Sequence, residues 1–108
     1  MRKLAVLSIV PVAACIALAV PASGASSYRV KMGDNFFKPK TVTVKKGTTV
    51  HWKWKTKAPH DVVGRGPSRF TSGSPKNHGN FSVKLNRKGT YRIVCVVHPK
   101  MKMTIKVR

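Results

Sequence analysis

The stretch GTYRIVCVVHPKM, residues 89–101, decides how this chain folds and where its chemistry lies. Tyr91, Ile93 and Cys95 occupy alternate positions and would therefore share one face of a β-strand. Apolar residues alternate again over 103–107. The pattern predicts two strands joined by a short loop, with the loop and its flanks carrying residues that bind metals.

Outward from this stretch, the chain shows more short apolar runs separated by turn residues. Val50, Trp52 and Trp54 share one face of their run, and polar residues take the other. Residues 64–80 are rich in Gly, Pro, Ser and Asn and are predicted to form loops. The predicted strands are 28–32, 41–44, 50–55, 62–63, 81–85, 91–95 and 103–107. Because no helical period is present, the sequence predicts an all-β fold, an antiparallel sandwich or barrel.

The loop of residues 95–101 offers three different ligand types. Cys95, His98 and Met101 carry a thiolate, an imidazole and a thioether. His60, which follows Pro59 near the end of a predicted strand, is the natural fourth ligand. Two His and one Cys with a weak axial Met are typical of a type 1, or blue, copper site. The sequence therefore predicts a site for one copper ion.

Several alternatives compete with this assignment. Met103 could replace Met101 as the axial ligand, but it is expected to lie within the closing strand. His51 and His78 are expected to be surface residues. A structural zinc site prefers four Cys or His ligands, and a Cys–His nucleophile needs an activated thiolate facing a cleft. We therefore expect no enzyme and no catalytic residues.

The first 25 residues are typical of a secretory signal peptide. A basic start precedes the apolar stretch Leu4–Val20, and small residues then lead to Ala25. Cleavage after Ala25 would leave a single domain of residues 26–108, in the periplasm, outside the cell or at its surface. An uncleaved membrane anchor and a lipoprotein modified at Cys15 are the alternatives.

Cysteine usage and charge constrain the exported domain further. Without the leader, Cys95 is the only cysteine, so a disulfide within the monomer is impossible. The whole chain has 22 basic and two acidic residues, a formal charge of +20. Removing the two basic residues of the leader gives 20 basic and two acidic residues, about +18. An acidic redox protein or an anionic envelope surface suits such a basic protein, whereas export and the lack of a recognised motif argue against nucleic acid.

Residues 89–101 resemble the C-terminal copper loop of the cupredoxins, the blue type 1 copper proteins. The spacing C-x-x-H-P-x-M is closest to that of amicyanin, with a shorter His-to-Met step than in plastocyanin. The segment Ala58-Pro59-His60-Asp61-Val62 resembles the loop carrying the first histidine of that family, and the resemblance covers residues 28–108. It implies a cupredoxin-like antiparallel β-sandwich of Greek-key connectivity.

The resemblance also implies one-electron transfer, with the copper ion cycling between Cu(II) and Cu(I), and it implies roles for individual residues. Cys95, His60 and His98 would form the trigonal plane around copper, and Met101 would lie axially. His98 would be the electron port, with Lys100 and neighbouring lysines steering an acidic partner of this monomeric carrier. Copper delivery, storage or protection would use the same ligands and is the second hypothesis.

Two positions depart from the family pattern. Asp61 stands where Asn often ties the two ligand loops together, and Trp54 stands where a polar Asn is common. Asp61, Pro59 and Pro99 are expected to surround the ligands, with the two prolines stiffening the loops.

Overall fold

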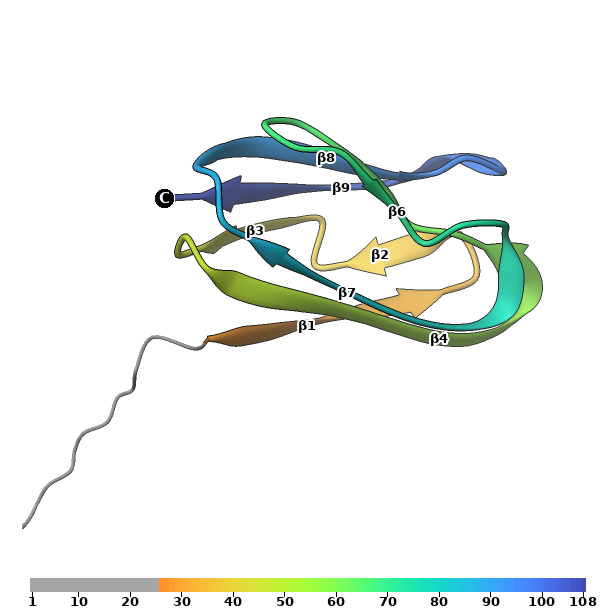
Figure 1. Cartoon of the computed structure of the whole chain (residues 1–108). Coiled ribbons are helices and arrows are strands. Elements are labelled where there is room, and N and C mark those ends of the chain that lie inside the picture. The colour runs from red at the N-terminus through yellow and green to blue at the C-terminus, as the bar shows by residue number, and fades with distance from the viewer. Residues whose placement is uncertain (1–25) are drawn as a thin grey trace, which may run out of the picture.

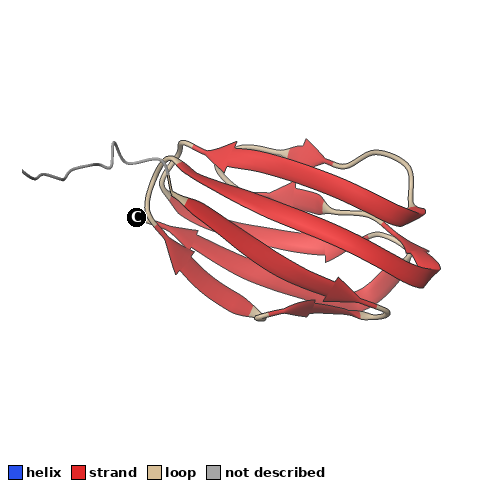
Figure 2. Ribbon diagram, turned by 90° about the horizontal axis from the view of Figure 1, so that it is seen from below, coloured by secondary structure: helices blue, strands red, loops and turns tan. Residues whose placement is uncertain are grey.

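The computed structural model describes residues 26–108, which form two β-sheets packed face to face (Figures 1 and 2). The predicted signal peptide, residues 1–25, lies outside the described residues. None of the described residues belongs to a helix long and apolar enough to cross a membrane.

The first sheet has four strands in the order β2-β1-β4-β7. Its members are β1 (Ser27–Gly33), β2 (Phe36–Lys38), β4 (Thr48–His60) and β7 (Lys76–Leu85). The second sheet has the order β3-β9-β8-β5-β6. It consists of β3 (Thr41–Val44), β5 (Val63–Arg65), β6 (Phe70–Thr71), β8 (Gly89–Cys95) and β9 (His98–Val107).

The predicted all-β sandwich is confirmed, but the sheets are mixed rather than purely antiparallel. β1 pairs with β4 in parallel, and β3 pairs with β9 in parallel. Parallel neighbours require a crossover connection. Between β1 and β4 the chain makes this crossover by forming β2 and then β3, which belongs to the opposite sheet.

The core lies between the sheets and follows the alternation read from the sequence. Val50, Trp52 and Trp54 of β4 are buried, as are Tyr91 and Ile93 of β8. The intervening residues of β4 face outward and are exposed or half-buried. The period of two therefore decides which side chains are excluded from water.

The prediction of loops over residues 64–80 was right for 66–69 and 72–75 and wrong for the rest. The segment contains β6, parts of β5 and the first half of β7. Gly79 lies in β7 opposite Trp54, and a Cβ at residue 79 would overlap the Trp54 ring. The Trp54 indole N–H also donates to the Lys76 carbonyl over 2.8 Å. The glycine that suggested a loop is instead where β7 accommodates a large ring.

Both segments that carry predicted ligands reach the same end of the sandwich. β4 ends at His60, β8 ends at Cys95, and β9 begins at His98. In Figure 1 the β8–β9 loop lies at the opposite end of the molecule from the C-terminus. The fold thereby brings residues 35 and 38 positions apart in the sequence to one site.

Candidate metal centre

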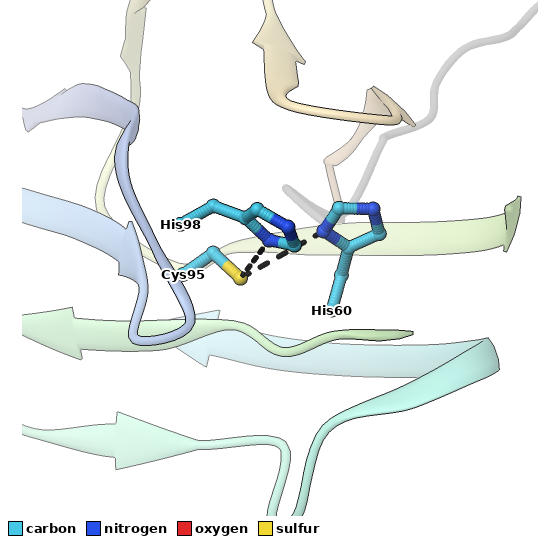
Figure 3. Close-up of side chains that lie close together, drawn as sticks. All are labelled: His60, Cys95 and His98. Carbon is cyan, nitrogen blue, oxygen red and sulfur yellow. Dashed lines mark hydrogen bonds between the residues drawn. The ribbon is translucent and has the colours of Figure 1, made fainter. Parts of the chain in front are cut away.

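His60, Cys95 and His98 form a compact cluster (Figure 3). The Cys95 Sγ lies 3.8 Å from His60 Nδ1 and 3.6 Å from His98 Nδ1. One ligand atom from each residue lies within 4.8 Å of the other two. Among residues 26–108 this is the one group of His, Cys and acidic side chains close enough to hold a metal ion.

Burial differs among the three residues. His60 and Cys95 are 0% and 1% exposed, whereas His98 is half-buried. Burial raises the pKa of the Cys95 thiol, although backbone N–H groups of Asp61 and Val97 lower it in part. A metal that binds the thiolate must therefore displace a proton from a thiol that otherwise holds it firmly.

The donor set fits copper. A soft thiolate suits Cu(I), and two imidazoles suit both copper oxidation states. Both histidines present the same ring atom, Nδ1, toward the sulfur.

Met101 lies on β9, three residues after His98, and is 1% exposed. It lines a surface cavity together with His98 and Pro99. Met103 is also buried, but it lies further along β9 and pairs with Ile93 of β8 within the core.

Asp61 connects the two segments that carry the ligands. Its side chain is 2% exposed, and its Oδ1 accepts a hydrogen bond of 2.9 Å from the backbone N–H of Val96. The aspartate thus occupies the bridging place that the resemblance gives to Asn. Pro59 and Pro99, the flanking prolines, are exposed next to His60 and His98.

The remaining histidines lie away from the cluster. His51 is on the outer face of β4, where its Nδ1 lies 2.6 Å from Ser82 Oγ. His78 is exposed on β7 rather than in a loop.

Sequence reasoning missed Asp34, in the turn between β1 and β2. Its Oδ1 accepts a 3.0 Å hydrogen bond from His60 Nε2. It also accepts hydrogen bonds from the backbone N–H groups of Lys57 and Ala58. The bond from His60, followed by those two backbone bonds, lowers the pKa of Asp34 to about 2. Asp34 precedes His60 by 26 residues, so no local sequence signal joined them.

Comparison with known sequences agrees with this geometry. The profile of the copper binding proteins of the plastocyanin/azurin family matches residues 25–108. Plastocyanin of Nostoc punctiforme is 38% identical over 65 residues, 56% of this chain and 47% of its own length. Amicyanin-alpha of Methylorubrum extorquens is 34% identical over 88 residues, 78% of this chain and 74% of its own length. The chain thus spans about half of the plastocyanin and three quarters of the amicyanin.

Solved structures of copper proteins also resemble this chain in fold. Oxidised amicyanin carrying a proline-to-glycine substitution has a TM-score of 0.65 at 26% identity, covering 85% of this chain and 90% of that one. A copper-containing nitrite reductase from Thermus scotoductus has a TM-score of 0.66 at 27% identity, but the match covers only 25% of the reductase. With a profile match over residues 25–108 and a cluster of two imidazoles and one thiolate, the chain belongs to the plastocyanin/azurin family of copper-binding proteins.

Proposed function

We propose that this protein is an exported type 1 copper protein that transfers single electrons between redox partners. The observation that carries the proposal is the convergence of Cys95 Sγ with the Nδ1 atoms of His60 and His98, with only His98 reaching the surface. Copper supplies a one-electron couple when it is bound, and a buried ligand set that stays in place on both sides of that couple suits repeated cycling.

Met101 completes the proposed ligand set as the axial donor. Its burial near His98 on β9 supports this role. Met103 is buried opposite Ile93 of β8, further from the cluster along β9, which favours Met101 over Met103. Four protein donors would leave no open position for a substrate, which favours electron transfer over catalysis. The match to one quarter of a nitrite reductase concerns a shared domain and does not by itself imply that activity.

The surface around His98 supports its role as the electron port. Val96 and Val97 are 53% and 47% exposed beside it, which is unusual for valine. Lys100 and Lys102, which follow on β9, are exposed as well. An apolar contact area with a basic rim suits brief docking of an acidic redox protein.

Export rests on the sequence of residues 1–25, with its basic start, apolar stretch and small residues before Ala25. An oxidising compartment would also suit a domain whose one thiol, Cys95, is buried and committed to a metal.

The visible spectrum of the domain during titration with Cu(II) tests the proposal. We expect an intense thiolate-to-copper band that saturates at one equivalent, and reversible one-electron voltammetry of the product. Cys95→Ala should abolish the band, since the thiolate is its source. A colourless copper complex of the unsubstituted protein would contradict the type 1 assignment.

Copper delivery remains the competing function, because it uses the same ligands. Transfer of copper to a chelating acceptor distinguishes the two. An electron carrier with buried Cys95 and His60 should retain its copper through many redox cycles, whereas a delivery protein should lose it to the acceptor within minutes.

A further inference from the structure

We propose that Asp34 is a positioning residue of the copper site, which fixes the ring of His60 and favours Cu(II) over Cu(I). This inference rests on the proposed copper function. The carboxylate oxygen lies 3.0 Å from His60 Nε2, on the side of the ring opposite to the cluster.

The contact selects the tautomer of the imidazole. An ionised carboxylate can only accept hydrogen bonds, so Nε2 of His60 must carry the proton. In a neutral imidazole the other nitrogen, Nδ1, is then left with a free lone pair. Nδ1 is the atom that faces Cys95 Sγ at 3.8 Å. Asp34 therefore selects the tautomer that can bind a metal at the cluster.

Asp34 also holds the backbone that leads to His60. The pairing of β4 with β7 shifts register between Lys55 and His60, so the intervening residues leave the regular ladder. The N–H groups of Lys57 and Ala58 donate to Asp34 Oδ2 and Oδ1 over 3.2 and 3.0 Å. One carboxylate thus satisfies two backbone donors of the irregular segment and the ring at its end.

The distribution of charge gives an independent reason to assign a role to Asp34. The whole chain contains two acidic residues against 22 basic ones. Asp61 bonds the backbone next to Cys95, and Asp34 bonds the ring of His60. Each of the two carboxylates therefore accepts a hydrogen bond from a segment that carries a predicted ligand.

The consequence concerns the balance of oxidation states. A carboxylate that accepts the outer N–H of a metal-bound imidazole makes the ring a stronger donor, and its negative charge stabilises the higher charge of Cu(II). Loss of such an outer partner typically weakens metal binding by about 10- to 100-fold. We expect Asp34→Ala to lower the affinity for Cu(II) about tenfold relative to Cu(I), which corresponds to a rise of about 59 mV in the reduction potential.

The experiment compares three variants. Asp34→Ala removes the acceptor, and Asp34→Asn keeps an oxygen acceptor but not the charge. Asn77→Ala is the matched control, because Asn77 Nδ2 donates to the Lys57 carbonyl and steadies the same segment without contacting the ring. We measure the reduction potential of the copper protein and the ¹⁵N shifts of the His60 ring in the metal-free protein.

The expected order of potentials is Asp34→Ala above Asp34→Asn above the parent protein, with Asn77→Ala equal to the parent. The His60 ring should carry its proton on Nε2 in the parent and in Asp34→Asn. In Asp34→Ala both tautomers should be populated. Equal changes of the reduction potential in Asn77→Ala and Asp34→Ala would overturn the proposal, since loosening of the segment before His60 would explain both. An unchanged potential in Asp34→Ala, or in Asp34→Asn should the alanine variant not fold, would overturn it as well.

The ring measurement needs no copper, so it separates this inference from the proposed function. A parent protein with the proton on His60 Nδ1 would contradict the role of Asp34 even if the blue site forms. A colourless copper complex with the Nε2 proton in place would instead contradict the proposed function alone.

Discussion

Single residues at the end of β8 and the start of β9 carry the predicted copper chemistry, and Met101 on β9 is the proposed axial ligand. The thioether is a soft, weak donor, and the axial ligand of a type 1 site tunes its potential. Replacing it with a harder oxygen donor stabilises Cu(II), whereas an apolar side chain removes the donor altogether.

We expect Met101→Gln to lower the reduction potential and Met101→Leu to raise it, by about 59 mV for each tenfold change in relative Cu(II) affinity. Both variants should keep the thiolate band, because Cys95 and the two histidines remain. Voltammetry and the visible spectrum measure these effects. Met103→Leu is the control, since Met103 is buried in the core pairing. A larger shift in Met103→Leu than in Met101→Leu would reverse the assignment of the axial ligand.

Asp61 affects stability at the same scale. Asp61→Ala leaves the N–H of Val96 without its 2.9 Å partner. An unsatisfied donor of this kind costs about 1–3 kcal/mol of unfolding free energy, or about 4–8 °C in melting temperature for each kcal/mol in a domain of this size. Thermal unfolding of the metal-free protein measures the loss. Asp61→Asn keeps an acceptor oxygen and should recover most of it; a melting point as low as that of Asp61→Ala would show that the charge, not the bond, matters.

At the scale of elements, β4 and β7 determine the geometry of the end that binds metal. β4 runs from Thr48 to His60, and its pairing with β7 continues past the irregular segment to Lys76. The ring of Trp54 lies over Gly79 just before that segment. Packing here therefore decides where the end of β4, and with it His60, is placed.

We expect Gly79→Ala to destabilise the fold by about 1–3 kcal/mol, because the added methyl group would overlap the Trp54 ring. Chemical denaturation of the metal-free protein measures the change. Asn80→Ala, at the exposed neighbouring position, should alter stability by less than about 0.5 kcal/mol. Equal stability of the two variants would mean that β7 can move away from Trp54 without cost.

At the scale of the whole molecule, we expect a bound metal to add to the stability of this small domain. The described chain has 83 residues (26–108) and one free cysteine, so no disulfide supports its core. Ligand binding to the folded state adds stability that grows with the logarithm of free ligand concentration.

Removal of copper should therefore lower the melting temperature. At free copper about 100 times the dissociation constant, the bound protein gains about 2.7 kcal/mol over the metal-free one. Calorimetry with and without a copper chelator measures this difference. In Cys95→Ala, copper should stabilise far less; equal stabilisation of the two proteins would place the metal elsewhere.

The charge of the molecule leads to a second prediction at this scale. A formal charge of +20 for the whole chain, about +18 without residues 1–25, should make association with an acidic redox protein fall steeply with ionic strength. Stopped-flow rates between 10 and about 300 mM salt would measure this. Lys100→Ala should reduce the rate more than Lys84→Ala, because Lys100 lies beside His98 and Lys84 on the outer face of β7. Equal effects would indicate attraction by net charge without a preferred docking face.

The sequence by itself determined the fold class and two residues of the cluster, Cys95 at the end of β8 and His98 at the start of β9. Strand alternation depends only on neighbouring residues, and Cys95, His98 and Met101 lie so close together in the chain that any turn brings them to one end of a sheet. The family pattern around His60 supplied the remaining residue of the cluster. These features are local or depend on short motifs, so they can be predicted from the sequence.

Only the tertiary structure decided the rest. The parallel pairs β1–β4 and β3–β9 join strands distant in sequence, and their formation depends on packing across the sandwich. Within residues 64–80, the first half of β7 pairs with β4 where the Trp54 ring lies over Gly79, a contact between distant residues that no local pattern encodes. Asp34 reads as an ordinary turn residue, and it reaches His60 only because β1 and β4 lie side by side, which brings a carboxylate to the outer nitrogen of a ligand.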